Sequence, residues 1–159
     1  MEDVVTKPWH RFTFRTVWRG LPAPPCRVYA ELEQVGNYPS WWPQIREASA
    51  RDHESGTVRL RSVLPLEHRV TLRAEWRDPA AGELGVVMAG DLRGWVRCVV
   101  IAEPGGGSRV DFEQYTEVAT PFLRFVALPG RPLLRANHTL MMRAGHRGLT
   151  AWLRSLEED

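Results

Sequence analysis

The stretch "NYPSWWPQIREA" (residues 37–48) sets two adjacent tryptophans between two prolines. A buried tryptophan hides roughly 150–250 Å² of surface. At about 25 cal/mol per Å², this burial stabilises a fold by at most about 4–6 kcal/mol per side chain. Pro39 and Pro43 restrict the backbone around Trp41 and Trp42, which predicts a short helix or a tight turn. We therefore expect the rest of the chain to cover this pair.

The sequence before this stretch predicts one strand and one short helix. Residues 9–20, "WHRFTFRTVWRG", alternate between two faces in the manner of a half-buried strand. Residues 21–39 begin with prolines suited to a first helical turn, and Gly36 stands where a C-cap glycine belongs. The tryptophan pair follows this helix directly.

The sequence after it predicts an antiparallel meander and a long final helix. Turn signals separate strands expected at residues 57–65, 67–76, 83–90, 94–103 and 108–119. Thr120 is expected to cap a short helix that Pro121 opens, and Pro132 opens the last helix, over residues 131–156. The apolar repeat of this helix predicts a buried stripe of Leu134, Asn137, Met141, Ala144, Gly148, Trp152 and Leu156, opposite Arg135, Thr139, Arg143, His146, Arg147, Thr150 and Arg154.

Composition favours one ordinary globular domain over residues 1–159. The chain is 43% hydrophobic and 25% charged, with a net charge of +2, which is typical of a soluble protein. It shows no basic run of the kind that marks a nucleic-acid arm, no membrane span and no secretory signal, so we expect a cytoplasmic protein. Twenty arginines against one lysine hint at a GC-rich bacterial genome. Cys26 and Cys98 lack paired spacing and are expected to be buried.

Three motifs resemble a known family. They are "VGNYPSWWPQIREA" (35–48), "GDLRGW" (90–95) and "RPLLRANHTLMMRAGHRGLTAWL" (131–153). Together with the order of elements, they make the chain similar to the START-like (Bet v 1-like, SRPBCC) helix-grip superfamily, in its bacterial polyketide cyclase/dehydrase-type branch. The resemblance implies an α+β fold, in which a curved antiparallel sheet of about seven strands surrounds a long C-terminal helix. It also implies two short helices after the first strand, and a hydrophobic cavity.

The resemblance also suggests what the tryptophan pair covers. In such a fold the two short helices close one end of the sheet, so Trp41 or Trp42 would cap the interior near the cavity mouth. We expect one of them to pack in the core and the other to line the cavity. The alternative is that both are plain core packing.

The alternation of side chains within the expected hairpins predicts which residues line the cavity. Suitable turns place Cys98 opposite Gln114 and Leu60 opposite Leu72. These registers leave in water the charged side chains of Arg59, Arg61, Arg69, Arg73, Glu75, Asp111, Glu113 and Glu117. They predict a ligand-binding interior of Phe14, Leu60, Ser62, Leu72, Trp76, Met88, Cys98, Phe112, Gln114 and Thr116, facing Asn137 and Met141 on the last helix, with Trp41 and Trp42 near its mouth.

The expected interior offers little to acid–base chemistry. Every polar side chain assigned to its strands is neutral, whereas proton transfer needs a group of tunable pKa. His138 is the nearest catalytic candidate, although a lone helical histidine is more often a hydrogen-bonded packing residue. His10, His53, His68 and His146 are scattered without metal-binding spacing, so we expect neither a metal nor another cofactor.

Three functions are compatible with such an interior. The leading hypothesis is a non-catalytic binder or carrier of a small hydrophobic molecule, lipid-like or polyketide-like. The second is an aromatase/cyclase that positions a poly-β-ketone chain for folding, and the third is a protein-interaction module without a ligand. The expected partner is the small molecule, with no nucleic acid, and we expect a monomer or a weak homodimer.

Ligand binding and any activity should be indifferent to chelators, because the sequence shows no cluster of metal ligands. Adding EDTA to the purified protein, and then divalent metals, should change neither the affinity for a hydrophobic probe nor a measured turnover. A reproducible loss with EDTA that zinc restores would reveal a site assembled from distant histidines.

Overall fold

The computed structural model describes residues 11–52, 54–61, 67–118 and 131–159. Its strands form one seven-stranded antiparallel sheet in the order β1-β7-β6-β5-β4-β3-β2. The strands are β1 (Arg11–Leu21), β2 (Ile45–Ala50), β3 (Ser55–Arg61), β4 (Glu67–Asp78), β5 (Glu83–Gly90), β6 (Leu92–Ala102) and β7 (Ser108–Val118). The helices are α1 (Pro25–Glu33), the 3₁₀ helix η1 (Val35–Ser40) and α3 (Arg131–Glu157). The expected α+β helix-grip fold is confirmed.

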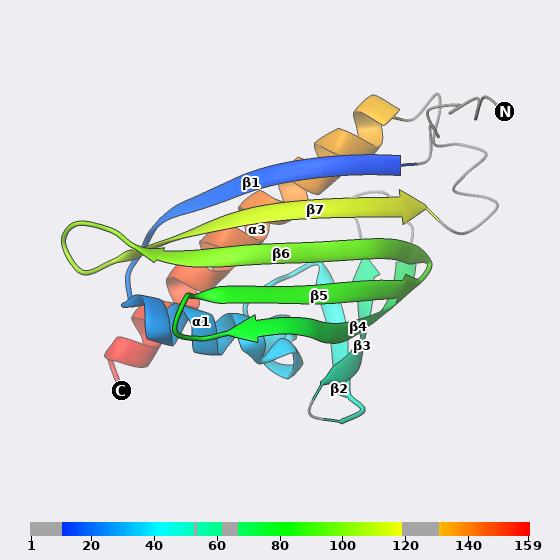
Figure 1. The fold of residues 1–159 in the computed structure, drawn as a ribbon. Coiled ribbons are helices and arrows are strands. Elements are labelled where there is room, and N and C mark those ends of the chain that lie inside the picture. Colours follow the sequence, from blue (N-terminus) through cyan, green and yellow to red (C-terminus); the bar gives the residue numbers. More distant parts are fainter. Residues whose placement is uncertain (1–10, 53, 62–66, 119–130) are drawn as a thin grey trace, which may run out of the picture.

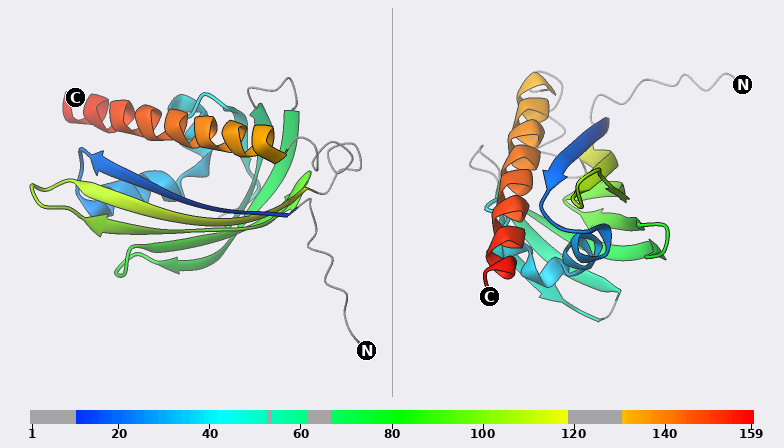
Figure 2. Two further views of the ribbon diagram at one scale, coloured as in Figure 1. Left: turned by 90° about the horizontal axis from the view of Figure 1, so that it is seen from above. Right: turned by 90° about the vertical axis from the view of Figure 1, so that its left-hand side faces the viewer.

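The sheet is strongly bent and α3 lies across its open side (Figure 2). In Figure 1, β2 and β3 run steeply to the direction of β1 and β7, so the sheet curls around the space beside the helix. α1 and η1 lie at the end of the molecule where α3 ends. The interior is therefore bounded by the sheet, by α3 and by the two short helices.

The first strand forms as expected, but the helix after it does not end at Gly36 as expected. β1 buries Phe12 and Trp18 on its inner face, as its alternation predicts. α1, however, ends at Glu33 with Gln34 as its C-cap, and Gly36 lies inside η1. The glycine does not adopt the positive φ of a C-cap, so the chain continues into a second, tighter helix.

The two cysteines differ in their surroundings. Cys98 is buried, but Cys26 is exposed in the first turn of α1, so the expectation that both are buried is half wrong. The reason is helical geometry, because Cys26 faces away from the buried stripe of α1. The short helix expected at Thr120 and Pro121 lies outside the described residues.

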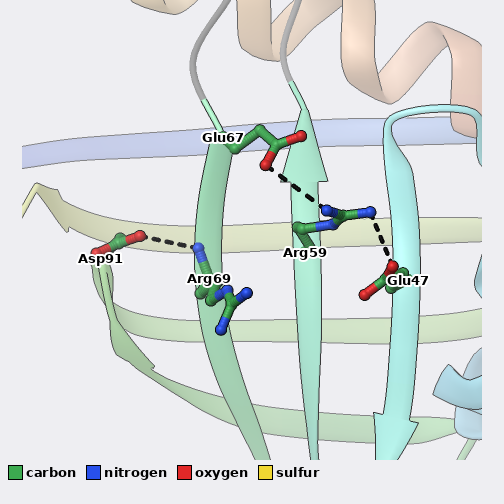
Figure 3. Close-up of polar contacts among 5 residues, drawn as sticks. All are labelled: Glu47, Arg59, Glu67, Arg69 and Asp91. Atoms are coloured by element: carbon green, nitrogen blue, oxygen red, sulfur yellow. Dashed lines mark hydrogen bonds and ion pairs between the residues drawn. The ribbon is translucent and has the colours of Figure 1, made fainter.

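Ion pairs on the outer face connect β2 to β3 and β3 to β4. The sequence pattern does not reveal β2, because only one of its six residues is buried. The guanidinium of Arg59 lies 2.9 Å from Glu47 of β2 and 3.8 Å from Glu67 of β4 (Figure 3). Beside them, the backbone N–H of Arg69 donates a hydrogen bond to Asp91 at 2.8 Å. These contacts hold the charged side chains on the outer face, opposite the cavity.

Both expected hairpin registers are wrong, although the faces are right. Cys98 pairs with Phe112 instead of Gln114, a shift of two residues. Leu60 pairs with His68, four residues from its expected partner. Because both shifts are even and side chains alternate with a period of two, each side chain stays on its expected face. The alternation of a strand determines which of its side chains face the interior, but it does not determine where the hairpin turn lies.

A β-bulge in β4 overturns one assigned cavity residue. The pairing with β5 slips between Ala74 and Trp76, and one extra residue reverses the alternation beyond it. Trp76 therefore lies on the outer face, 56% exposed, with its indole N–H donated to Glu83 at 2.9 Å. The expectation that Trp76 lines the cavity is wrong, and Arg77 lies at the cavity rim instead.

The buried stripe of α3 is rotated by one residue position, about 100°, from the expected one. Its buried residues are Met142, Gly145, Leu149 and Leu153. Gly145 lies against Trp42, where a Cβ would come within 2.6 Å of the indole ring. The seven residues of the expected stripe are only partly buried. The expected stripe contains Gly148 but not Gly145, because a helical pattern does not show which glycine the ring of Trp42 packs against.

The tryptophan pair lies directly on α3. A Cβ at Gly148 would overlap the carbonyl oxygen of Trp41, so only glycine admits this contact. The indole N–H of Trp42 donates to the Met141 carbonyl at 2.9 Å. The two indoles stack at 5.4 Å, and Trp18 contacts them edge-on at 6.5 and 5.5 Å. Rings from β1 and from the segment after η1 thus join the sheet to the helix.

Gly148→Ala should destabilise the protein. Alanine gains about 1 kcal/mol of helix propensity over glycine, but overpacking typically costs about 1–3 kcal/mol, and here the methyl group would displace backbone. Because backbone has to move, the cost lies at the upper end of this range, and urea denaturation should show a net loss of about 2 kcal/mol. Gly36→Ala is the matched control, because a Cβ there meets nothing within 4 Å. Equal stabilities of the two variants would contradict the contact between Trp41 and α3.

Candidate ligand-binding cavity

A cavity of about 540 Å³ lies between the inner face of the sheet and the N-terminal half of α3. Its walls are mostly apolar and come from all seven strands, both short helices and α3. The assigned residues that line it are Phe14, Trp42, Leu60, Leu72, Met88, Cys98, Phe112, Gln114, Thr116, Asn137 and Met141. Trp41 and Trp76 are not among the lining residues, and Ser62 lies outside the described residues.

The two tryptophans of the opening motif have different surroundings. Trp42 lines the cavity, whereas Trp41 packs in the core and is 4% exposed. The ring of Tyr38 lies 4.9 Å from Trp41 and 5.9 Å from Trp42. Tyr38 donates its hydroxyl to the Leu32 carbonyl, and burial raises the pKa of this phenol. This end of the cavity is therefore closed by rings without an ionised group among them.

A chain of neutral polar side chains forms one wall. The Nε2 of His138 lies 3.2 Å from the Oε1 of Gln114, and the amide N–H of Gln114 donates to the Thr116 hydroxyl at 2.6 Å. The imidazole stacks on Phe14 at 3.7 Å, with 11° between the ring planes. Because the amide oxygen accepts, Nε2 of His138 carries the proton, and Nδ1 keeps its lone pair.

Burial determines the charge of this histidine. Desolvation lowers the pKa of His138 to about 4, and the nearby Arg135 guanidinium contributes in the same direction. The imidazole is therefore neutral near pH 7. Burial also raises the pKa of the Cys98 thiol to about 12, which leaves it protonated and a poor nucleophile.

His68 is a cavity residue that sequence reasoning missed. It lines the cavity from β4, and burial lowers its pKa, with Asp91 opposing that shift. The expectation that the strands supply no titratable group to the interior is therefore wrong. The sequence contains a signal for this position, because His68 lies on the same face of the strand as Val70 and Leu72, which also line the cavity.

Four charged side chains are among the residues that line the cavity. Glu33 of α1, Asp52 and Glu54 of the turn between β2 and β3, and Arg77 of β4 lie there and are exposed. Sequence alone does not place these four at the cavity, because they come from three separate elements. Within the described ranges, no three His, Cys, Asp or Glu side chains gather closely enough to hold a metal ion.

Comparison with known proteins assigns the chain to a family. Residues 21–135 match the family model described as "Polyketide cyclase / dehydrase and lipid transport". The chain belongs to this family. None of the curated proteins matches it.

Solved structures share the fold at low sequence identity. A protein of Thermus thermophilus has a TM-score of 0.73 and 18% identity, over 92% of this chain and 98% of that one. A START superfamily protein of Mycobacterium smegmatis has a TM-score of 0.68 and 12% identity, over 92% and 99%. The Zhui aromatase/cyclase of Streptomyces sp. R1128 has a TM-score of 0.62 and 14% identity, over 91% and 93%. These similarities establish the START-like fold alone.

The buried imidazole should make stability fall at acidic pH. The pKa of His138 is about 4 when folded, below the ordinary 6.5, so the unfolded chain binds its proton first. Stability from this residue is thus complete above about pH 6.5 and lost as the pH falls towards 4. At pH 5 the loss is about 2 kcal/mol relative to neutral pH. Urea denaturation of His138→Gln should show a pH dependence smaller by this amount, while an unchanged slope would contradict a buried, neutral His138.

Proposed function

We propose that the protein binds a small hydrophobic molecule, lipid-like or polyketide-like, in the internal cavity and carries it without transforming it. The observation that supports this most directly is the apolar cavity of about 540 Å³. Its volume falls within the range of about 300–1,000 Å³ that ligand pockets occupy, and its few polar groups are of the kind that orient a ligand. A cavity of this size counts against the third hypothesis, a collapsed interior in a protein-interaction module.

The polar wall supports binding more than catalysis. A general acid or base works best when its pKa lies near the working pH, and the pKa of His138 lies well below neutrality. Gln114 and Thr116 donate and accept hydrogen bonds but do not titrate near pH 7. Such a wall favours a ligand with a hydroxyl or carbonyl group directed towards it.

The second candidate is an aromatase/cyclase acting on a poly-β-ketone. The observation that favours it is the neutral Nδ1 of His138, which could accept a proton from an activated carbon or hydroxyl if a substrate reached it. His68 adds another imidazole to the same cavity. Both residues keep this candidate open to a direct test.

The wider setting of the proposal follows from the sequence. No helix within the described residues is long and apolar enough to cross a membrane. We propose a cytoplasmic, bacterial protein that works as a monomer or a weak homodimer, without a cofactor and without nucleic acid. Native mass spectrometry of gently purified protein would show whether a small molecule co-purifies with it.

Gln114→Leu should weaken binding of an oxygenated probe but not of an apolar one. Leucine removes the amide group that can hydrogen-bond the hydroxyl of 2-naphthol, so the affinity for this probe should fall by about 1–3 kcal/mol. Naphthalene, of nearly the same shape, should bind as well or better. Quenching of tryptophan fluorescence measures both affinities, and urea denaturation measures the stability.

Gln44→Leu is the matched control, because Gln44 is not among the cavity-lining residues and should leave both affinities unchanged. A large loss of stability in Gln114→Leu with unchanged relative affinities would make Gln114 a structural residue. Failure of both probes to bind the unmutated protein would refute the binding function itself. A pH-dependent turnover of a poly-β-ketone that His138→Ala abolishes would establish the cyclase instead.

A further inference from the structure

The two halves of α3 differ in how they pack. All of its buried residues lie in the C-terminal half, from Met142 onward, where the tryptophan pair contacts the helix. Within residues 131–141 every side chain is partly or fully exposed. The inner side of this N-terminal half lines the cavity with Leu134, His138 and Met141. It is therefore a thin wall between the cavity and the surface.

The outer side of the same half carries exposed apolar side chains. Leu133 is 54% exposed and Leu140 is 44% exposed, and they belong to the four large hydrophobic residues exposed on the described part of the molecule. A spacing of seven residues puts both leucines on one side of the helix, two turns apart. These exposures show that the described residues leave both leucines largely uncovered.

Positive charge surrounds these leucines. Between residues 131 and 156, α3 contains five arginines and no acidic residue, although the whole chain has a net charge of only +2. Arg135, Arg143 and Arg147 are exposed. Arg143 and Arg147 follow Leu140 by three and seven residues, which extends the same side of the helix towards the C-terminus. The surface formed by Leu133, Leu140, Arg143 and Arg147 is here called the α3 outer surface.

We propose that the α3 outer surface docks onto an anionic lipid bilayer. Leucines flanked by arginines on a helix fit the boundary between headgroups and acyl chains, where apolar side chains insert and guanidinium groups meet lipid phosphates. A nucleic acid would use the arginines but has no use for exposed leucines. Docking in this way brings the thin wall of the cavity against the membrane. The inference goes beyond ligand binding and does not require an occupied cavity.

Vesicle co-sedimentation of the full chain tests this surface. One set of vesicles contains phosphatidylcholine with about one third phosphatidylglycerol, and the other contains phosphatidylcholine alone. The protein should bind the anionic vesicles at least about tenfold more tightly, and added salt should weaken this binding. L133S/L140S should weaken it by about tenfold or more, because the inserted apolar area is lost. R143Q/R147Q should weaken it roughly 25-fold, at about fivefold per arginine.

Matched control variants test whether the loss of vesicle binding is specific to the α3 outer surface. V17S/W76S removes exposed apolar side chains from the outer face of the sheet, and R61Q/R73Q removes exposed arginines from β3 and β4. Both controls should bind vesicles like the unmutated protein. Circular dichroism and thermal unfolding should show that all four variants remain folded, since each change is on the surface.

Several outcomes would overturn the proposal. They are absence of vesicle binding, equal binding to neutral and anionic vesicles, and equal losses in the control variants. Conversion of a solution dimer into a monomer by L133S/L140S, seen by analytical ultracentrifugation, would make this surface a self-interface instead. Because Leu133, Leu140, Arg143 and Arg147 are not among the residues that line the cavity, failure here leaves the binding function untouched, and failure of probe binding leaves the docking result standing.

Discussion

The packing of two tryptophans onto two helical glycines organises the rest of the structure. Gly145 admits the ring of Trp42 and Gly148 admits the backbone of Trp41, so the segment after η1 approaches α3 more closely than any larger residue would allow. Trp18 brings β1 into the same cluster. This contact fixes the C-terminal half of α3 against one end of the sheet. The N-terminal half of α3 extends from this contact across the inner face of the sheet. The cavity is the space between that half and the sheet.

The bent sheet keeps two chemical environments apart. Its outer face carries the charged side chains and the ion pairs of β2, β3 and β4, while its inner face is mostly apolar. The bulge in β4 is the point where this alternation reverses, and it moves Trp76 outward and Arg77 to the cavity rim. One extra residue in a strand thus changes the character of both surfaces.

The interior combines apolar walls with a polar chain that carries no charge near neutral pH. His138, Gln114 and Thr116 are joined by hydrogen bonds, and burial keeps the imidazole neutral. In a medium of low polarity, neutral hydrogen-bonding groups can orient a ligand at little electrostatic cost, whereas an unpaired charge would be strongly destabilising. Members of one fold host both carriers and enzymes, so this local chemistry has to distinguish them.

The sequence alone predicted the fold class, the face of the strand residues that it assigned outside the bulge, and eleven of the residues that line the cavity. These features follow from periodicity, which is local and survives a shift of register by an even number of residues. The family-like motifs added the curvature and the cavity that periodicity cannot supply.

Only the tertiary structure decided which side of α3 is buried, which tryptophan reaches the cavity and where Trp76 lies. It also placed the cavity polar chain, since His138 and Gln114 come from elements that meet only in the folded protein. Each of these depends on contacts between residues distant in the chain, such as glycine under tryptophan or a bulge against its partner strand. The residue pattern within one segment carries no information about such contacts, because the residues that pack against that segment belong to another part of the chain.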